Sequence, residues 1–341
     1  MTHPDPHPAP HSASHPAPHP APHSAPPRAH ASSLPLFAAL LAAGVIAPFL
    51  VYPTFLMKVL CFALFAAAFN LLLGFAGLLS FGHAAFFASG AYVCGVLCKR
   101  YGVTPELGIL CGAAFAGVLG ALFGLLAIRR SGIYFAMITL ALAQLVYFLD
   151  VQFPFTGGED GIQGIPRGRL FGLIDLSDNF AMYFLVLAIF LGGFWLIHRA
   201  IHSPFGQVLK AIRENEARAI SLGYAVERYK LLAFVLSATL AGLAGSTKAI
   251  VFQLASLTDA HWHMSGEVVL MTLLGGLGTV LGPPVGALVI VGLESQLADK
   301  VGSWVTVIMG AIFVACVLAF RRGIVGELAA LRLSRRAGNG D

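Results

Sequence analysis

The chain has 341 residues, of which 57% are apolar and only 11% are charged. Soluble domains carry about 25% charged residues, so this composition excludes a soluble globular protein and indicates a protein with many membrane-spanning segments. The net charge of +5 is therefore interpreted by its location along the chain, and not as a sign of nucleic-acid binding.

Residues 1–33 consist mainly of Pro, Ala, Ser and His, with a histidine at every fourth position from His3 to His23. Such a segment cannot bury enough apolar surface to fold, so we expect a disordered, dispensable cytoplasmic tail. Metal binding by its imidazoles is the alternative. The segment lacks a basic start followed by a short apolar core, so we do not interpret it as a signal peptide.

The rest of the chain predicts an all-α fold, a polytopic transmembrane helical bundle over residues 34–325 followed by a cytoplasmic tail at 326–341. Apolar stretches of about 20 residues match the roughly 30 Å thickness of a bilayer core. The ten predicted segments are 36–52, 54–74, 76–98, 105–128, 132–151, 180–197, 229–251, 265–281, 283–297 and 302–320.

The third and eighth segments are interrupted by glycines, within the runs Asn70–Tyr92 and Gly266–Pro284. Broken apolar helices in corresponding places of two halves of a chain indicate a transport pathway near mid-membrane. Irregular backbone at that depth is tolerated where it faces protein or a water-filled cavity. We therefore expect these two segments to be bent or re-entrant.

Basic residues set the expected orientation. If the N-terminus is cytoplasmic and all ten segments cross, the inner side holds fourteen Lys and Arg residues and the outer side seven. Lys99 and Arg100 are the main exceptions. Both termini and the segment 203–223 are then predicted to be cytoplasmic.

The segment 203–223 predicts one short amphipathic surface helix. Ser203 is a candidate cap, Pro204 suits the first turn, and Gly223 suits the end of the helix. Its apolar side is formed by Phe205, Val208, Leu209 and Ile212. A soluble partner could push on such a helix, and an interfacial helix lying on the lipid headgroups is the alternative.

Polar residues inside apolar segments are costly and are candidates for a translocation pathway. Interhelical hydrogen bonding is the alternative role for each. The set lacks the relay of deep acidic and basic groups that proton- or sodium-coupled pumps carry, which favours transport powered from outside the chain. The candidates are Asn70, Ser80, His83, Gln144, Glu267, Thr272 and Glu294.

Nucleotide-binding and catalytic signatures are absent from the sequence. In Gly242–Lys248 the Ser and Thr precede the lysine, whereas a phosphate-binding loop needs them after it, so small-residue helix packing explains this stretch better. Cys94 and Cys98 lie one helical turn apart without further ligands nearby, so we expect packing and not a metal site. We predict no enzyme activity, no bound cofactor and no metal.

Five runs together resemble one family, the LivM-type permeases of bacterial ABC importers for branched-chain amino acids. The resemblance extends over roughly residues 36–325, with the motifs in the family's order. The runs are Asn70–Tyr92, Arg130–Gln144, Thr156–Ile162, Ser203–Gly223 and Leu274–Gly286.

The resemblance implies a complex with a second permease subunit, two cytoplasmic ATPases that hold the ATP and Mg²⁺, and a periplasmic substrate-binding protein. It also implies that 203–223 docks on an ATPase, although Glu216, Ala217 and Gly223 only approximate the family's EAA…G pattern. The implied docking residues are Phe205, Lys210, Ile212, Arg213, Glu214, Glu216 and Gly223.

The expected function is translocation of branched-chain or related amino acids. The same machinery carrying urea or short amides is one alternative, and an autonomous secondary transporter or channel is another. A membrane-embedded enzyme is a remote third.

Overall fold

The computed structural model describes residues 34–304, 307–308, 310–311, 314 and 323–327. The predicted tail 1–33, most of the segment 302–320 and most of the tail 326–341 lie outside these residues. The helices are α1 (Leu34–Leu50), α2 (Pro53–Asn70), the π-helix η1 (Leu71–Ala76), α3 (His83–Arg100), α4 (Pro105–Ala127), α5 (Ile133–Gln152), α6 (Asn179–His202), α7 (Pro204–Glu214), α8 (Glu216–Ser221), α9 (Val226–Phe252), α10 (Leu257–Ala260), α11 (Trp262–Gly275) and α12 (Gly282–Val301).

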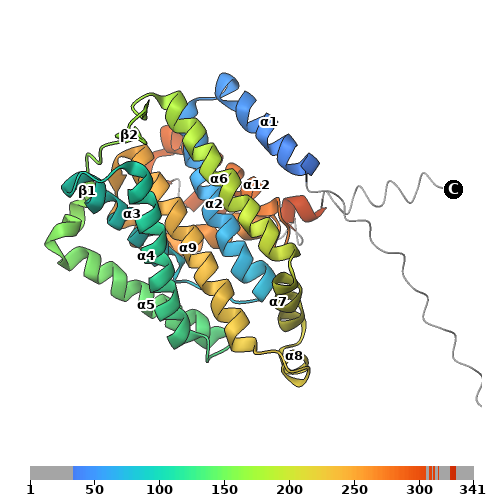
Figure 1. Cartoon of the computed structure of the whole chain (residues 1–341). Coiled ribbons are helices and arrows are strands. Elements are labelled where there is room, and N and C mark those ends of the chain that lie inside the picture. The colour runs from blue at the N-terminus through green and yellow to red at the C-terminus, as the bar shows by residue number, and fades with distance from the viewer. Residues whose placement is uncertain (1–33, 305–306, 309, 312–313, 315–322, 328–341) are drawn as a thin grey trace, which may run out of the picture.

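The predicted all-α bundle is confirmed (Figure 1). Within the described residues, five helices are long and apolar enough to cross a membrane: α2 continued by η1, α4, α5, α6 and α9. The outward sides of α4 and α5 expose large apolar side chains such as Leu110, Val118 and Met137. A protein in water would not expose so many apolar side chains on long helices, so the bundle is membrane-embedded.

Several helices begin where local chemistry allows it. Proline occupies the first turn of α2, α4 and α7, where a missing N–H leaves no hydrogen bond unmade. The carboxylate of Asp178 caps α6 by accepting from the backbone N–H groups of Phe180 and Ala181 at 3.2 and 3.4 Å. These starts fix the helix boundaries within a few residues of the predicted segments.

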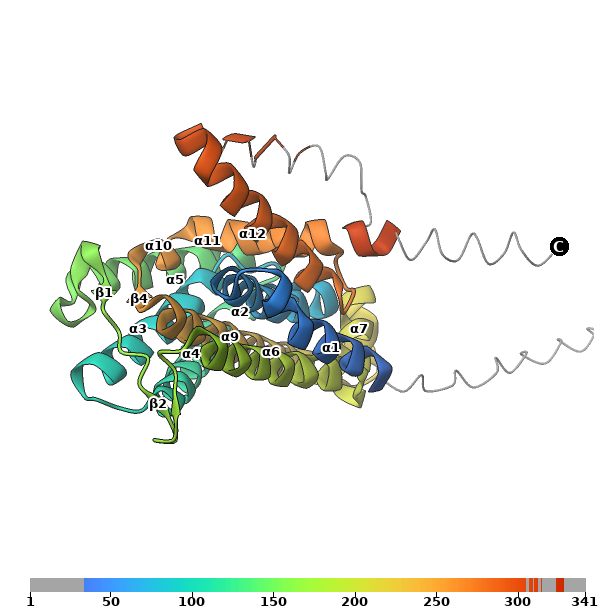
Figure 2. The same cartoon turned by 90° about the horizontal axis from the view of Figure 1, so that it is seen from above.

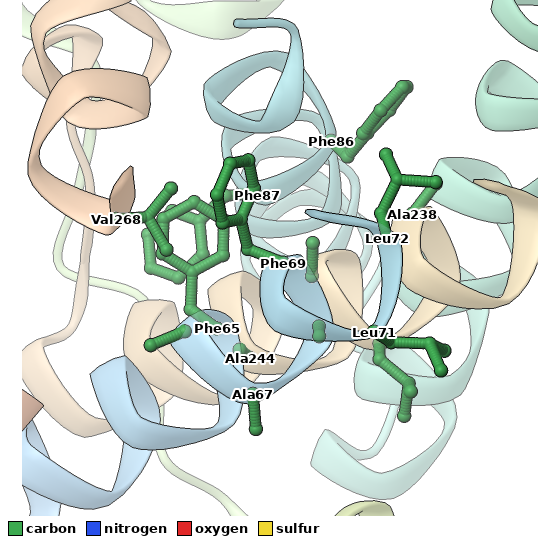
Figure 3. Close-up of a cluster of buried hydrophobic side chains, with 14 of the residues drawn as sticks. Phe65, Ala67, Phe69, Leu71, Leu72, Phe86, Phe87, Ala238, Ala244 and Val268 are labelled. Atoms are coloured by element: carbon green, nitrogen blue, oxygen red, sulfur yellow. The ribbon is translucent and has the colours of Figure 1, made fainter. Parts of the chain in front are cut away.

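Helix α2 forms the centre of the bundle. Its side chains Phe65 and Phe69 are fully buried, and the ring of Phe65 lies 4.5 Å from that of Phe87 on α3 (Figure 3). Aromatic pairs at this separation stabilise a core beyond the area they bury. Because α2 is central, its C-terminal end at Asn70 lies inside the bundle.

Helices α3, α4 and α9 pack through small residues, as the sequence predicted for Gly242–Lys248. Gly90 of α3 lies against the backbone of Gly242, and Gly245 lies against the backbone at Phe87. The hydroxyls of Ser246 and Thr247 donate to carbonyls one turn earlier in α9, each at 2.7 Å. This stretch is therefore a helix interface, formed by close backbone approach as in other membrane helix pairs.

The loops gather at two ends of the bundle (Figure 1). One end carries α7 and α8, and Arg129 of the α4–α5 loop lies beside Glu227 and Arg228 there. At the opposite end two short antiparallel pairs form, β1 (Ile162–Gln163) with β4 (Leu254–Ala255) and β2 (Arg169–Leu170) with β3 (Ile174–Asp175). The loop at Arg129 and the segment 203–223, both predicted to be cytoplasmic, thus lie at the same end of the bundle.

The two Gly-containing segments are broken, as predicted. Residues 77–82 separate η1 from α3, and residues 276–281 separate α11 from α12. Figure 2 shows α12 crossing α2 and ending outside the bundle. Each break therefore joins two helices into a hairpin, α2–α3 in the first half and α11–α12 in the second.

Candidate functional site

The two helix breaks meet at Asn70. This buried side chain stands at the end of α2 and is only 2% exposed. Its Nδ2 donates to the carbonyl of Thr279 at 2.9 Å, and its Oδ1 accepts from the N–H of Gly278 at 3.0 Å. Asn70, a predicted pathway residue, therefore binds one backbone carbonyl and one backbone N–H of the second break, residues 276–281.

Side chains satisfy the backbone that the breaks leave without helical partners. The N–H of Phe81 donates to Thr139 Oγ1 at 3.1 Å, and that of Ala84 donates to Ser265 Oγ at 2.9 Å. In the second break Thr279 Oγ1 accepts from the N–H of Gly282 at 3.0 Å. Irregular backbone survives at membrane depth only when it is satisfied in this way.

Both breaks contain glycines with positive φ. Gly77 follows η1 directly with φ +74°, whereas α11 is followed directly by Gly276 with φ +125°, and Gly278, with φ +72°, lies inside the second break. A side chain disfavours these conformations, so glycine is needed at these positions.

Arg213 of α7 connects the surface helix to both breaks. Its guanidinium donates to the carbonyl of Gly74 in η1. A Cβ at Gly77 would lie 3.0 Å from Arg213 Cγ, and a Cβ at Gly278 would lie 3.2 Å from Arg213 Nη1. The Arg213 side chain thus occupies the space where the two breaks and α7 converge.

The prediction of a single helix over 203–223 was wrong. Two helices form, α7 and α8, because Asn215 takes an extended conformation and its Oδ1 caps α8 by accepting from the N–H of Arg218 at 2.9 Å. Ser203 is also not a side-chain cap, since its hydroxyl donates backwards to the carbonyl of Ala200 at 2.7 Å. Gly223 ends α8 with φ +84°, as predicted.

The predicted docking residues divide between the bundle and the surface. Ile212 is 3% exposed and packs among Val208, Ala219 and Val226, and Phe205 stacks on Tyr229 with ring centres 5.9 Å apart. The apolar side of α7 therefore faces the bundle.

The charged members of the predicted docking set lie nearer the surface. Glu214 is exposed, and Lys210 is half-buried with its Nζ 5.7 Å from the Phe75 ring. Glu216 accepts from Lys230 Nζ at 2.6 Å, and the Lys230 side chain is only 6% exposed. This ion pair ties α8 to α9.

A surface patch that the sequence analysis missed lies on and after α8. Ile220, Leu222 and Tyr224 are 57%, 68% and 41% exposed, although they belong to the most polar segment of the bundle. Their spacing of two residues does not follow the helical period, so the sequence pattern did not indicate them. These three residues form an exposed apolar patch at this end, and we refer to them as the α8 patch.

Three of the predicted pathway residues are enclosed. Ser80, His83 and Thr272 are fully buried. His83 Nε2 lies 2.8 Å from Ser237 Oγ, whose own hydroxyl donates to the carbonyl of Ala68 at 2.6 Å. In this conformation His83 and Thr272 join neighbouring helices, which is the alternative role stated for such residues. Ser80 Oγ instead accepts from the N–H of Gly82 in its own loop.

The remaining candidates lie apart from the breaks. Gln144 is half-buried on α5. Glu267 and Glu294 line a cavity of 510 Å³ at the end opposite α7 and α8, together with Lys58 and Lys248. The sequence analysis identified the two glutamates but not their lysine neighbours, of which Lys58 is 236 positions from Glu294.

Among the described residues, Cys61, Cys94 and Cys98 are buried between helices, whereas Cys111 is exposed. Cys94 and Cys98 lie buried with their Sγ atoms 4.0 Å apart and contact the position of Gly108. Among the residues that the structure describes, no three metal-ligating side chains come together.

Comparison with known proteins places the chain in a family. The family described as branched-chain amino acid transport system / permease component matches residues 51–317. The chain is 29% identical over 284 residues to the high-affinity branched-chain amino acid transport system permease protein LivM of Escherichia coli, covering 75% of this chain and 65% of that protein. It therefore spans about two thirds of the length of this relative.

Of two further relatives, one is named for a different solute and one for branched-chain amino acids. The autoinducer 2 import system permease protein LsrC of Klebsiella pneumoniae is 31% identical over 199 residues, covering 54% of this chain and 53% of that protein. The probable branched-chain amino acid transport permease protein LivH of Methanocaldococcus jannaschii is 26% identical over 269 residues, covering 72% and 82%. No solved structure matches the chain. Because the family match covers most of the sequence, the chain belongs to the permease components of branched-chain amino acid transport systems.

Proposed function

We propose that this chain is a membrane-spanning subunit of an ABC importer that translocates branched-chain or related amino acids. Separate ATPase subunits power it, a second permease subunit completes the pathway, and a periplasmic binding protein delivers the solute. The 34–325 region acts as one permease domain in a bacterial inner membrane, with both termini in the cytoplasm. ATP and Mg²⁺ are bound by the partners.

The contact of Arg213 with the first break carries this proposal. A surface helix that touches the backbone of both hairpins can transmit a push to the pathway without any coupling chemistry of its own. Non-helical backbone at the breaks has fewer hydrogen bonds to lose than a regular helix, so it can rearrange at lower cost. Movement of α7 would then shift the breaks and open the route alternately to either side.

The α8 patch supports an ATPase at this end. Exposed apolar residues rimmed by charged groups mark protein–protein contact sites. Here Ile220, Leu222 and Tyr224 lie in the same segment as the exposed Glu214 and Arg218. An autonomous transporter has no use for such a patch, which favours the subunit reading over that alternative.

Co-purification with the ATPase tests the proposal. We would express the tagged chain with the ATPases encoded by its neighbouring genes and compare native protein with Leu222→Asp and Ile220→Asp. Both substitutions should abolish ATPase recovery, because a buried carboxylate in an interface core is strongly unfavourable.

Leu173→Asp is the matched control, since Leu173 is 87% exposed in the loop at the opposite end. It should leave ATPase recovery unchanged. Equal recovery with all three variants would contradict docking at the α8 patch, and no ATPase bound to the native chain would contradict the proposed function itself.

A further inference from the structure

The charged cavity at the end opposite α7 is built from both hairpins. Lys58 is on α2, Glu267 is on α11 and Glu294 is on α12, while Lys248 and Asp259 come from α9 and α10. Its volume of 510 Å³ falls within the range of roughly 300–1,000 Å³ that small-molecule sites occupy. A solute held there would contact both hairpins whose breaks meet at Asn70.

The ion pair between Lys248 and Asp259 in this cavity is short and largely buried. Lys248 Nζ lies 2.6 Å from both carboxylate oxygens of Asp259, and the two side chains are 13% and 2% exposed. Because each group already has a full-strength partner, this pair is structural and joins α10 to α9.

The other charged groups retain binding capacity. Lys58 Nζ donates to Glu294 at 3.0 Å, and within the described residues it makes this one hydrogen bond although an ammonium has three N–H groups. Glu267 Oε1 lies 3.8 Å from His263 Nδ1, beyond hydrogen-bond distance. The ammonium of Lys58 and the carboxylate of Glu267 thus line the same cavity, and both have hydrogen-bonding capacity to spare.

Apolar side chains complete the lining. Phe62, Phe252, Leu254 and Met264 border the charged groups. A ligand that fits must therefore carry one positive group, one negative group and an apolar body.

We propose that this cavity binds an α-amino acid with an apolar side chain, with its ammonium at Glu267 and its carboxylate at Lys58. The inference rests on the proposed function and names the substrate class of the same permease. A neutral solute such as urea carries no charge with which to pair the free N–H groups of Lys58 or the carboxylate of Glu267. A zwitterion satisfies both together.

Ligand titration of the full chain in lipid nanodiscs tests this site. Trp262 stands between two lining histidines, with ring centres 5.8 Å from His261 and 5.7 Å from His263, so its fluorescence reports occupancy. We would titrate L-leucine and two analogues that each lack one charge, 3-methylbutylamine and 4-methylpentanoate. Leucine should bind saturably with a Kd at least ~10-fold lower than either analogue, a factor that corresponds to about 1.4 kcal/mol.

Single substitutions test which cavity residue binds the carboxylate of the ligand and which binds its ammonium. Lys58→Met should weaken leucine binding at least ~10-fold while leaving 3-methylbutylamine unaffected, because that ligand has no carboxylate. Glu267→Gln should weaken leucine and leave 4-methylpentanoate unaffected. The retained analogue shows in each case that the variant is folded. Lys99→Met and Glu159→Gln, outside the cavity, are the controls and should bind leucine as the native chain does.

Two results would overturn the proposal: leucine binding unchanged in both cavity variants, or an analogue that binds as tightly as leucine. ATPase co-purification on the same preparations separates this failure from failure of the proposed function. A chain that recovers its ATPase but shows no leucine site refutes only the cavity assignment.

Discussion

The guanidinium of Arg213, on the surface helix α7, donates a hydrogen bond to the backbone carbonyl of Gly74 in η1, which continues the central helix α2. These residues are 139 positions apart in the sequence. The contact places a charged surface helix directly on the first helix break. Asn70 extends the connection, because its amide binds the second break at Gly278 and Thr279.

Replacing Asn70 should loosen the joint between the two hairpins. Asn70→Ala removes two hydrogen bonds at a buried position and leaves the N–H of Gly278 without its partner, so we expect the free energy of unfolding to fall by about 1–3 kcal/mol. Denaturant titration in detergent measures it. Asn179→Ala, at an exposed position, serves as the control and should change stability by less than ~0.5 kcal/mol. Equal effects of the two substitutions would contradict a structural role for Asn70.

Two glycine-to-alanine substitutions test the α3–α9 interface. Gly245 lies against the backbone of Phe87, whereas Gly192 on α6 has open space around it. Alanine gains roughly 0.5–1 kcal/mol of helix propensity at either site. Gly192→Ala should therefore raise the melting temperature or leave it unchanged, and Gly245→Ala should lower it through overpacking of about 1–3 kcal/mol. A melting temperature that rises equally for both would show that the close approach is absent.

The Glu216–Lys230 ion pair should anchor α8. Glu216→Lys places two cations together at a site where Lys230 is nearly buried, so ATPase recovery should fall. The exchange Glu216→Lys with Lys230→Glu restores opposite charges and should recover most of it. If the double variant is as poor as Glu216→Lys alone, Glu216 contacts the partner itself and does not act through Lys230.

Composition alone predicted the bundle, because long apolar runs have one stable arrangement in lipid. The glycine breaks were also readable, since Gly77 and Gly278 both require positive φ. The prediction of a single docking helix was wrong because Asn215 ends α7 and caps a second helix, α8. The sequence did contain this signal, since Asn is a strong helix-capping residue.

The rest depends on tertiary packing. Sequence spacing cannot show that Asn70 reaches Thr279 or that Lys58 reaches Glu294, pairs more than 200 residues apart. The direction of the α7 face was likewise undetermined, because the same amphipathic pattern suits a helix that faces lipid, a partner or its own bundle. The α8 patch was missed because its spacing of two residues does not follow the helical period.

Coupled uptake by the reconstituted importer tests the central claim most directly. Solute uptake and ATP hydrolysis would be measured in the same proteoliposomes for the native complex, Arg213→Gln and Arg199→Gln, the last an exposed arginine at the same end that serves as the control. We expect Arg213→Gln to assemble and hydrolyse ATP while the solute carried per ATP falls at least ~10-fold, because the push of the ATPase no longer reaches the helix breaks. Arg199→Gln should keep the native ratio. An unchanged ratio in Arg213→Gln would contradict the claim that α7 drives the pathway through its contact with the helix breaks.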